Sequence, residues 1–306
     1  MSAAAASQVA APEAQAPPRR GKGRRWTSYI PLYTWIIIVG LSVPVFVMIV
    51  FSFNNPSGRQ NIKWEGFTTK NYTQIMDQTA IINSIKLSLE IAIFAMLIAT
   101  ALGALLGLAL GRYRFRGSAG VNYLVFLAIA SPEIVLGTSL LTLFANQFTF
   151  IKLGIPSIVI AHVMFCTSFV AVTVRARVQG LNPSMEEAAQ DLGANPVVTF
   201  MKVTLPLIMP GIIAGALLAF ALSIDDFVIT YFVSGSTTTF PLLIFGAAKT
   251  GITPSFNVIG TFLFTFGVLI ALFGSILPSV TARRDNKRLA QDREASAEFL
   301  SAGAGH

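Results

Sequence analysis

Six long segments of the chain carry few or no charged residues, and this feature restricts the possible folds most strongly. They span about residues 30–53, 84–110, 120–145, 154–175, 204–232 and 256–280. A helix needs about 20 apolar residues to cross a bilayer, and each segment reaches that length. Lipid offers no hydrogen-bond partners, and the segments lack the polar–apolar alternation of barrel strands, so they should be helices. The sequence predicts an all-α polytopic membrane protein with about six transmembrane helices.

The composition narrows the function class further. Hydrophobic residues make up 54% of the 306 residues and charged residues 12%, about half the charged share of a typical soluble protein. Cys166 is the single cysteine, which excludes an intrachain disulfide and a multi-cysteine zinc site. The two histidines, His162 and His306, do not suffice for a metal centre or a paired acid–base site in the membrane. We therefore expect a protein that is not an enzyme and that binds no metal or cofactor itself.

The distribution of basic residues predicts the orientation of the helices. The net charge is +8, and most Lys and Arg residues flank the apolar segments on the side that also holds both termini. Because basic loops tend to stay in the cytoplasm, we expect both termini there. On this interpretation residues 1–29 form a disordered basic cytoplasmic N-terminus, residues 30–281 a transmembrane domain, and residues 282–306 a cytoplasmic tail. The positive charge then reflects topology and requires no nucleic-acid partner.

The predicted cytoplasmic loop at residues 176–203 contains helix signals of its own. Pro183 suits the first turn of a short helix. Glu186 and Glu187 then lie in the early turns, where the helix dipole favours acidic side chains. Gly193 can end this helix, and a second helix follows it. We therefore expect a short helix-turn-helix that projects into the cytosol.

The same loop resembles a known motif. Glu187, Ala188 and Ala189 are followed after three residues by Gly193, and after nine more by the run at 203–206. This pattern is similar to the EAA loop of binding-protein-dependent (type I) ABC importer permeases, and it implies a MetI-like permease architecture with a cytoplasmic EAA-type coupling helix. In that family the short helix docks on the ATPase subunit and transmits its closure to the membrane helices. The resemblance assigns this coupling role to Ser184, Met185, Glu186, Glu187, Ala188, Ala189, Asp191, Leu192, Gly193 and Ala194.

Further runs resemble the spermidine/putrescine branch of that family. They lie at residues 131–135, 222–228, 240–242 and 249–254, with Glu133 where the family more often has Asp. The resemblance implies inward transport of a polyamine by alternating access across a prokaryotic cytoplasmic (inner) membrane. It also implies a homologous permease subunit in a heterodimer, an ATPase homodimer that binds ATP and Mg, and an extracytoplasmic substrate-binding protein. The chain lacks a phosphate-binding P-loop motif, as expected for a permease that relies on a separate ATPase.

Three carboxylates lie within the predicted spans. A carboxylate at the centre of a membrane helix costs about 2.5–3.5 kcal/mol on insertion scales, so Glu133, Asp225 and Asp226 should face a cavity or pair within the bundle. On a continuous helix the two adjacent aspartates would point about 100° apart. One of them can then face the pathway while the other meets the partner subunit or caps a helix break. Thr230, four residues on, favours Asp226 for the polar face. All three carboxylates are candidates for a substrate pathway.

A pathway that contains acids and no deep basic residue suits a cation. Phe227 and Tyr231 beside the aspartates offer aromatic faces for cation–π contact with ammonium groups, although helix packing also accounts for them. The sequence therefore favours a polyamine. The alternative is a permease of the same class for another solute, namely another organic cation, ferric ion or an inorganic anion. The lack of deep basic residues weighs against an anion.

Two further features concern packing. Gly103, Gly107 and Gly111 recur every four residues, which favours close helix packing within the chain or across a dimer interface. His162 is expected to hydrogen-bond to another helix, and Cys166 to be a small core residue.

Overall fold

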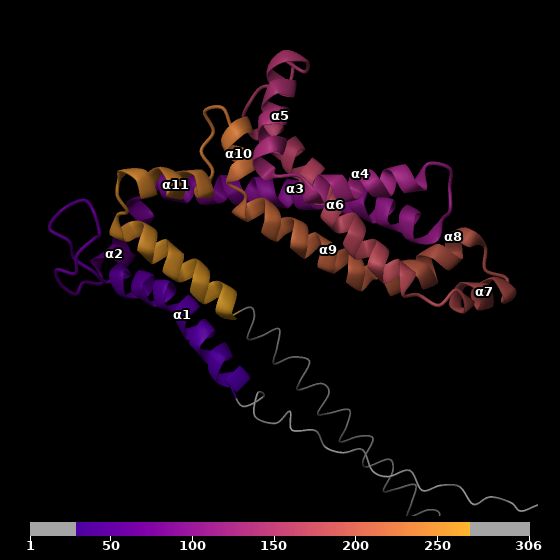
Figure 1. Cartoon of the computed structure of the whole chain (residues 1–306), viewed down its shortest axis with the longest axis horizontal. Helices are drawn as coiled ribbons and strands as arrows, with labels where there is room; N and C mark the ends of the chain where they lie inside the picture. Colours follow the sequence, from indigo (N-terminus) through magenta and orange to yellow (C-terminus); the bar gives the residue numbers. More distant parts are fainter. Residues whose placement is uncertain (1–28, 270–306) are drawn as a thin grey trace, which may run out of the picture.

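The computed structural model describes residues 29–269, and the regular elements in this part of the chain are helices (Figure 1). In order they are α1 (Tyr29–Ser52), α2 (Lys70–Thr73), η2 (Gln74–Asp77), α3 (Thr79–Arg112), α4 (Ser118–Ala130), α5 (Glu133–Asn146), α6 (Ile155–Gln179), α7 (Ser184–Asp191), α8 (Pro196–Thr199), η3 (Phe200–Thr204), α9 (Leu205–Asp225), α10 (Val228–Val233), α11 (Phe240–Thr250) and a last helix, Pro254–Leu269. The predictions for residues 1–28 and 282–306 lie outside the described residues.

The predicted all-α membrane fold is confirmed. Within residues 29–269, four helices are long and apolar enough to cross a membrane: α1, α3, α6 and the continuous stretch Pro196–Asp225. The bent pair of α4 and α5 makes a fifth if it is counted as one span. Of the expected sixth span at 256–280, the described residues contain the helix Pro254–Leu269, and the remainder lies outside them.

The centre of the molecule is a close bundle of α3, α6 and α9. The glycine stripe of α3 faces α6. A Cβ atom built on Gly103 would lie 2.6 Å from Val170 Cβ, and one on Gly107 would lie 2.6 Å from the backbone oxygen of Ala171. Only a glycine stripe allows two helices to come this near, and in lipid such van der Waals packing is a main source of helix association. The prediction of close packing is confirmed, and the contact lies within the chain.

The third predicted span, 120–145, is broken. Helices α4 and α5 meet at an angle of 106°, and the break falls at Ser131 and Pro132. Ser131 is extended, with ψ 133°. Proline has no N–H to continue the helix, and it disfavours helical geometry in the residue before it. The expected single helix is therefore wrong, and Glu133 begins a helix instead of lying in the middle of one.

The fifth predicted span, 204–232, is broken as well. Helix α9 ends at Asp225, Asp226 is extended with φ −65° and ψ 120°, and α10 begins at Val228. The Asp226 carboxylate accepts hydrogen bonds from the backbone N–H groups of Ile229 (3.3 Å) and Thr230 (2.8 Å), so it caps the first turn of α10. The continuous helix is therefore wrong, whereas the alternative that one of the two aspartates caps a helix break is confirmed for Asp226.

Helix α1 and the helix Pro254–Leu269 run side by side (Figure 1), and the latter packs Val258 and Ile259 against Ile81 at the start of α3. A Cβ atom on Gly260 would lie 2.5 Å from Met48 Sδ, which shows how closely they pack. The loop at 54–69 joins them, since the Asn61 N–H donates to the Ile252 carbonyl at 2.8 Å. Inside this loop Glu65 accepts hydrogen bonds from the backbone and side chain of Ser57, and these hydrogen bonds lower the pKa of Glu65.

Candidate functional site

The two helix breaks meet in space because α5 packs against α10. A Cβ atom on Gly137 would lie 2.6 Å from Phe232 Cδ2 and 3.4 Å from Ile229 Cα. Glu133 lies one turn before Gly137 on α5, at the end that faces the break between α9 and α10. The three candidate carboxylates therefore come together, near enough for the charge of Glu133 to interact with those of Asp225 and Asp226. Glu133 is solvent-exposed.

Asp226 belongs to a buried polar network. Its side chain is 5% exposed, and that of His162 on α6 is 3% exposed. Asp226 Oδ2 lies 3.2 Å from His162 Nε2 and accepts a hydrogen bond of 2.6 Å from Thr230 Oγ1. The sequence favoured Asp226 for the polar face because of Thr230. The structure joins the two side chains by a hydrogen bond but buries them inside the protein.

His162 links three helices. Its Nδ1 atom lies 2.7 Å from Ser223 Oγ on α9, and its Nε2 atom lies 2.9 Å from Thr230 Oγ1 on α10. Ser223 and Thr230 are both buried. The prediction that His162 bonds to another helix is confirmed. Nothing in the sequence indicated that Ser223 and Asp226 would share this partner.

Asp225 lies in different surroundings. It is exposed, and it lines a cavity of about 500 Å³. The other lining residues are Ile85, Ser88, Leu89, Ile224, Phe227, Phe240, Pro241, Ile244 and Leu263. Ser88 Oγ accepts a hydrogen bond of 2.8 Å from the Phe240 N–H, which fixes the start of α11 against α3. The cavity thus combines one carboxylate with aromatic and aliphatic walls.

Aromatic side chains continue from this cavity along α10 and α11. The ring centroids of Phe227 and Phe245 are 4.3 Å apart, and those of Phe227 and Tyr231 are 5.7 Å apart. The Lys249 ammonium lies over the Phe245 ring, 4.1 Å from its centroid. Phe245 and Lys249 were not among the sequence candidates. Their spacing of one helical turn within the apolar stretch at 242–248 is the signal that could have indicated them.

The predicted coupling segment contains the helix α7. The Ser184 N–H donates to Asn182 Oδ1 at 3.1 Å, and Gly193 ends the turn with a φ of +85°, which favours glycine. Helix α7 is exposed on most sides. Met185 and Leu192 are exposed apolar residues, the latter at 90%. Ser184, Glu187, Ala188, Asp191 and Gly193 are exposed too, whereas Glu186, Ala189 and Ala194 are half-buried.

Glu186 attaches α7 to the membrane helices. Its carboxylate pairs with the guanidinium of Arg112, the last residue of α3, and accepts a hydrogen bond of 2.8 Å from Thr204 Oγ1 on η3. Arg112 lies 74 positions before Glu186, so the sequence did not indicate this contact.

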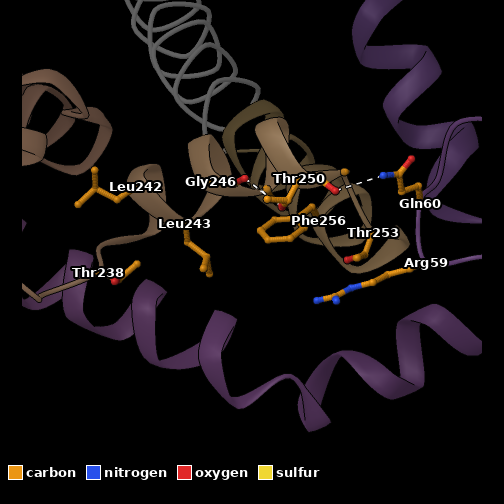
Figure 2. A pocket seen from close by; sticks show the side chains of 11 residues that line it. Arg59, Gln60, Thr238, Leu242, Leu243, Gly246, Thr250, Thr253 and Phe256 are labelled. Carbon is orange, nitrogen blue, oxygen red and sulfur yellow. Dashed lines mark hydrogen bonds between the residues drawn. The ribbon is translucent and has the colours of Figure 1, made fainter.

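A second cavity, of about 580 Å³, lies between the loop at 54–69 and α11 (Figure 2). The Arg59 side chain extends along it, and Gln60 donates a hydrogen bond of 3.2 Å to the Thr250 carbonyl at its rim. Thr238, Leu242, Leu243, Gly246, Ala247, Gly251, Thr253 and Phe256 complete the lining. The cavity holds a cationic side chain and no acidic one, so its electrostatic character is opposite to that of the Asp225 cavity.

Comparison with known proteins identifies the family of this chain. Residues 99–290 match the family described as "Binding-protein-dependent transport system inner membrane component". The chain belongs to this family. It is therefore a membrane permease of an ABC import system, a transport component and not an enzyme, and the family implies an ATPase and a binding protein as partners.

Several relatives resemble this permease over most of their length. The spermidine/putrescine transport system permease protein PotC of Escherichia coli (strain K12) is 40% identical over 238 residues, which covers 78% of this chain and 89% of the relative. PotC of Haemophilus influenzae is 37% identical over 255 residues, covering 83% and 96%. The putrescine transport system permease protein PotI of Escherichia coli (strain K12) is 38% identical over 263 residues, covering 83% and 92%.

Solved structures support the fold. A bacterial ABC transporter involved in the import of the acidic polysaccharide alginate superposes with a TM-score of 0.61 at 15% identity, covering 86% of this chain and 99% of that chain. An amino acid ABC transporter gives a TM-score of 0.50 at 18% identity, covering 68% and 98%. At these identities the likeness concerns the fold and not the substrate.

Proposed function

We propose that this permease moves a polyamine, such as spermidine or putrescine, inward by alternating access that is coupled to a separate ATPase. Relatives at 37–40% identity are named as spermidine/putrescine or putrescine permeases. The observation that carries the proposal is the cavity at Asp225, where a solvent-accessible carboxylate lies among aromatic and aliphatic walls. A polyamine presents the matching chemistry, because its ammonium groups are separated by methylene spacers.

The electrostatics of the two helix breaks support a cationic substrate. Glu133 at the start of α5 and Asp225 at the end of α9 are both exposed carboxylates. Separated carboxylates can take separate ammonium groups of one polyamine.

The aromatic cluster supports the same substrate class. Cations bind over aromatic faces within about 6 Å of the centroid. The Lys249 ammonium already lies in such a position on Phe245, next to Phe227 and Tyr231. Because Lys249 occupies the Phe245 face, the ring that an ammonium group of the substrate would use is that of Phe227, which lines the Asp225 cavity.

The coupling mechanism follows from α7. The segment from Ser184 to Ala194 docks on an ATPase homodimer that binds ATP and Mg. Met185 and Leu192 are its exposed apolar contacts. Closure of the ATPase shifts the population of permease conformations toward the outward-open one. Glu186 passes the movement to α3 and η3.

The assembly and orientation belong to the same proposal. The chain pairs with a homologous permease in a heterodimer, and both termini lie in the cytoplasm of a prokaryotic cell. The extracytoplasmic binding protein docks on the loop at 54–69 and on α11, and the Arg59 cavity between them takes one of its acidic side chains. The ion pairs found within residues 29–269 do not involve Arg59, so its guanidinium is available for such a contact.

The test is transport by the purified complex in proteoliposomes with its binding protein. Radiolabelled spermidine and putrescine are compared with other organic cations, ferric ion and inorganic anions. We expect polyamine uptake, reduced at least tenfold by Asp225→Asn because that substitution removes the charge at the cavity. Asp77→Asn, an exposed aspartate of η2 away from the cavity, is the matched control. Uptake of another solute alone, or equal uptake by both variants, would refute the polyamine assignment at this cavity.

A further inference from the structure

The adjacent residues Asp225 and Asp226 lie in opposite environments. Asp225 is exposed at the cavity, whereas the Asp226 side chain is 5% exposed inside the bundle. The two environments exist because the helix stops between the two residues, with Asp226 extended at φ −65° and ψ 120°. The contacts that keep the helix broken therefore also determine the position of Asp225.

The break is unfavourable without the buried network. A buried carboxylate is costly unless hydrogen bonds satisfy it. The Asp226 carboxylate accepts hydrogen bonds from the N–H groups of Ile229 and Thr230 and from the Thr230 hydroxyl, and it contacts the imidazole of His162. Without this set of contacts, the apolar residues after Asp226 could continue α9, since apolar surroundings favour internal backbone hydrogen bonds.

His162 is the part of this network that comes from outside the broken span. It lies on α6, and its two ring nitrogens reach Ser223 before the break and Thr230 after it, at 2.7 and 2.9 Å. A single side chain thus spans the break and holds both of its ends. Phe227 and Tyr231 lie on the same short segment, so their positions depend on the same contacts.

We propose that His162 is a positioning residue for substrate binding. It acts through Asp226 and Ser223 to keep α9 and α10 apart as two helices, and it thereby holds Asp225 at the wall of the cavity. His162 itself is buried and does not touch the substrate. This inference rests on the proposed function, because it assigns the cavity at Asp225 to the transported cation.

The experiment measures equilibrium binding of radiolabelled spermidine to the permease–ATPase complex in nanodiscs, with a non-hydrolysable ATP analogue and without binding protein. It records the dissociation constant and the number of binding sites separately. We expect His162→Gln to raise the dissociation constant roughly tenfold, as the loss of a hydrogen bond to a charged group would. Ser223→Ala removes the Nδ1 contact alone, so its effect should be smaller and in the same direction.

A double-mutant cycle separates positioning from a general structural role. In the Asp225→Asn background, His162→Gln should raise the dissociation constant much less, because the charged group that it positions is gone and only the aromatic contacts can still be displaced. If His162→Gln lowers the number of sites through poor folding, Ser223→Ala in both backgrounds decides the question. Equal effects of the substitutions with and without Asp225, or an unchanged dissociation constant in both variants, would overturn the inference.

The same experiment distinguishes this inference from the proposed function. If Asp225→Asn alone leaves the dissociation constant unchanged, the cavity is not the polyamine site and both proposals fall. If Asp225→Asn weakens binding but His162→Gln and Ser223→Ala do not, the site remains and the positioning role is wrong.

Discussion

Substitution of Glu186 by glutamine should uncouple ATP hydrolysis from transport. The Glu186 carboxylate is the polar contact that ties α7 to both Arg112 and Thr204. Glutamine keeps the size of the side chain and one oxygen that can accept from Thr204. It removes the charge that pairs with Arg112.

The expected magnitude follows from the exposure of the pair. The side chains of Arg112 and Glu186 are 29% and 16% exposed, so the pair is neither fully solvated nor fully buried. Hydrogen bonds to charged groups contribute about 1.5–3 kcal/mol, and an exposed ion pair contributes about 0.2–1 kcal/mol. A value of about 1.4 kcal/mol lies between these ranges. It corresponds to about a tenfold loss in the population of attached α7.

The assay is the number of ATP molecules hydrolysed per spermidine molecule transported in proteoliposomes. We expect this ratio to rise up to about tenfold for Glu186→Gln, because ATPase closure would move α7 without moving α3. Asp191→Asn also removes one charge from α7 but touches neither Arg112 nor Thr204, so its ratio should change less. Reversal of the pair by Glu186→Arg with Arg112→Glu should restore part of the coupling. An unchanged ratio in Glu186→Gln and in Glu186→Ala would show that α7 transmits movement by another route.

Two further predictions concern packing and docking. Gly107→Ala should destabilise the purified complex by about 1–3 kcal/mol and so lower its melting temperature, because the new Cβ would meet the backbone of Ala171, which cannot rotate away. Gly40→Ala is the control, since no atom lies within 4 Å of its Cβ position. Equal melting temperatures of the two variants would contradict the packing argument. Arg59→Glu should weaken binding of the binding protein to the complex in nanodiscs by roughly tenfold, as measured by biolayer interferometry, because it reverses the charge in the Arg59 cavity. Lys63→Glu, outside that cavity, should have a smaller effect, and equal effects would place docking elsewhere.

The sequence predicted the membrane fold because the requirement for apolar length is local and strict. It also predicted the glycine stripe of α3, since a period of four residues needs no knowledge of the partner helix. The α7 segment is marked by Pro183 and Gly193, which are again local signals.

The two helix breaks could not be predicted from hydropathy. A continuous span and a broken one contain the same apolar residues, and Pro132 could equally have kinked a single helix. The break between α9 and α10 depends on the contact of Asp226 with His162, which lies 64 positions away in sequence and meets it only inside the folded bundle. The pairing of Arg112 with Glu186 has the same origin, because each residue alone resembles an ordinary charge at the end of a helix.

The length of α3 has a mechanical consequence. Its 34 residues measure about 51 Å, more than the 30 Å or so of a hydrocarbon core. Ser88 near one end holds the start of α11 at the Asp225 cavity, and Arg112 at the other end holds α7. About 36 Å of helix separate these two residues, and the glycine contacts with α6 stiffen the rod between them. If α3 moved as one rigid rod, a tilt of about 5° about Arg112 would displace the cavity wall at Ser88 by about 3 Å.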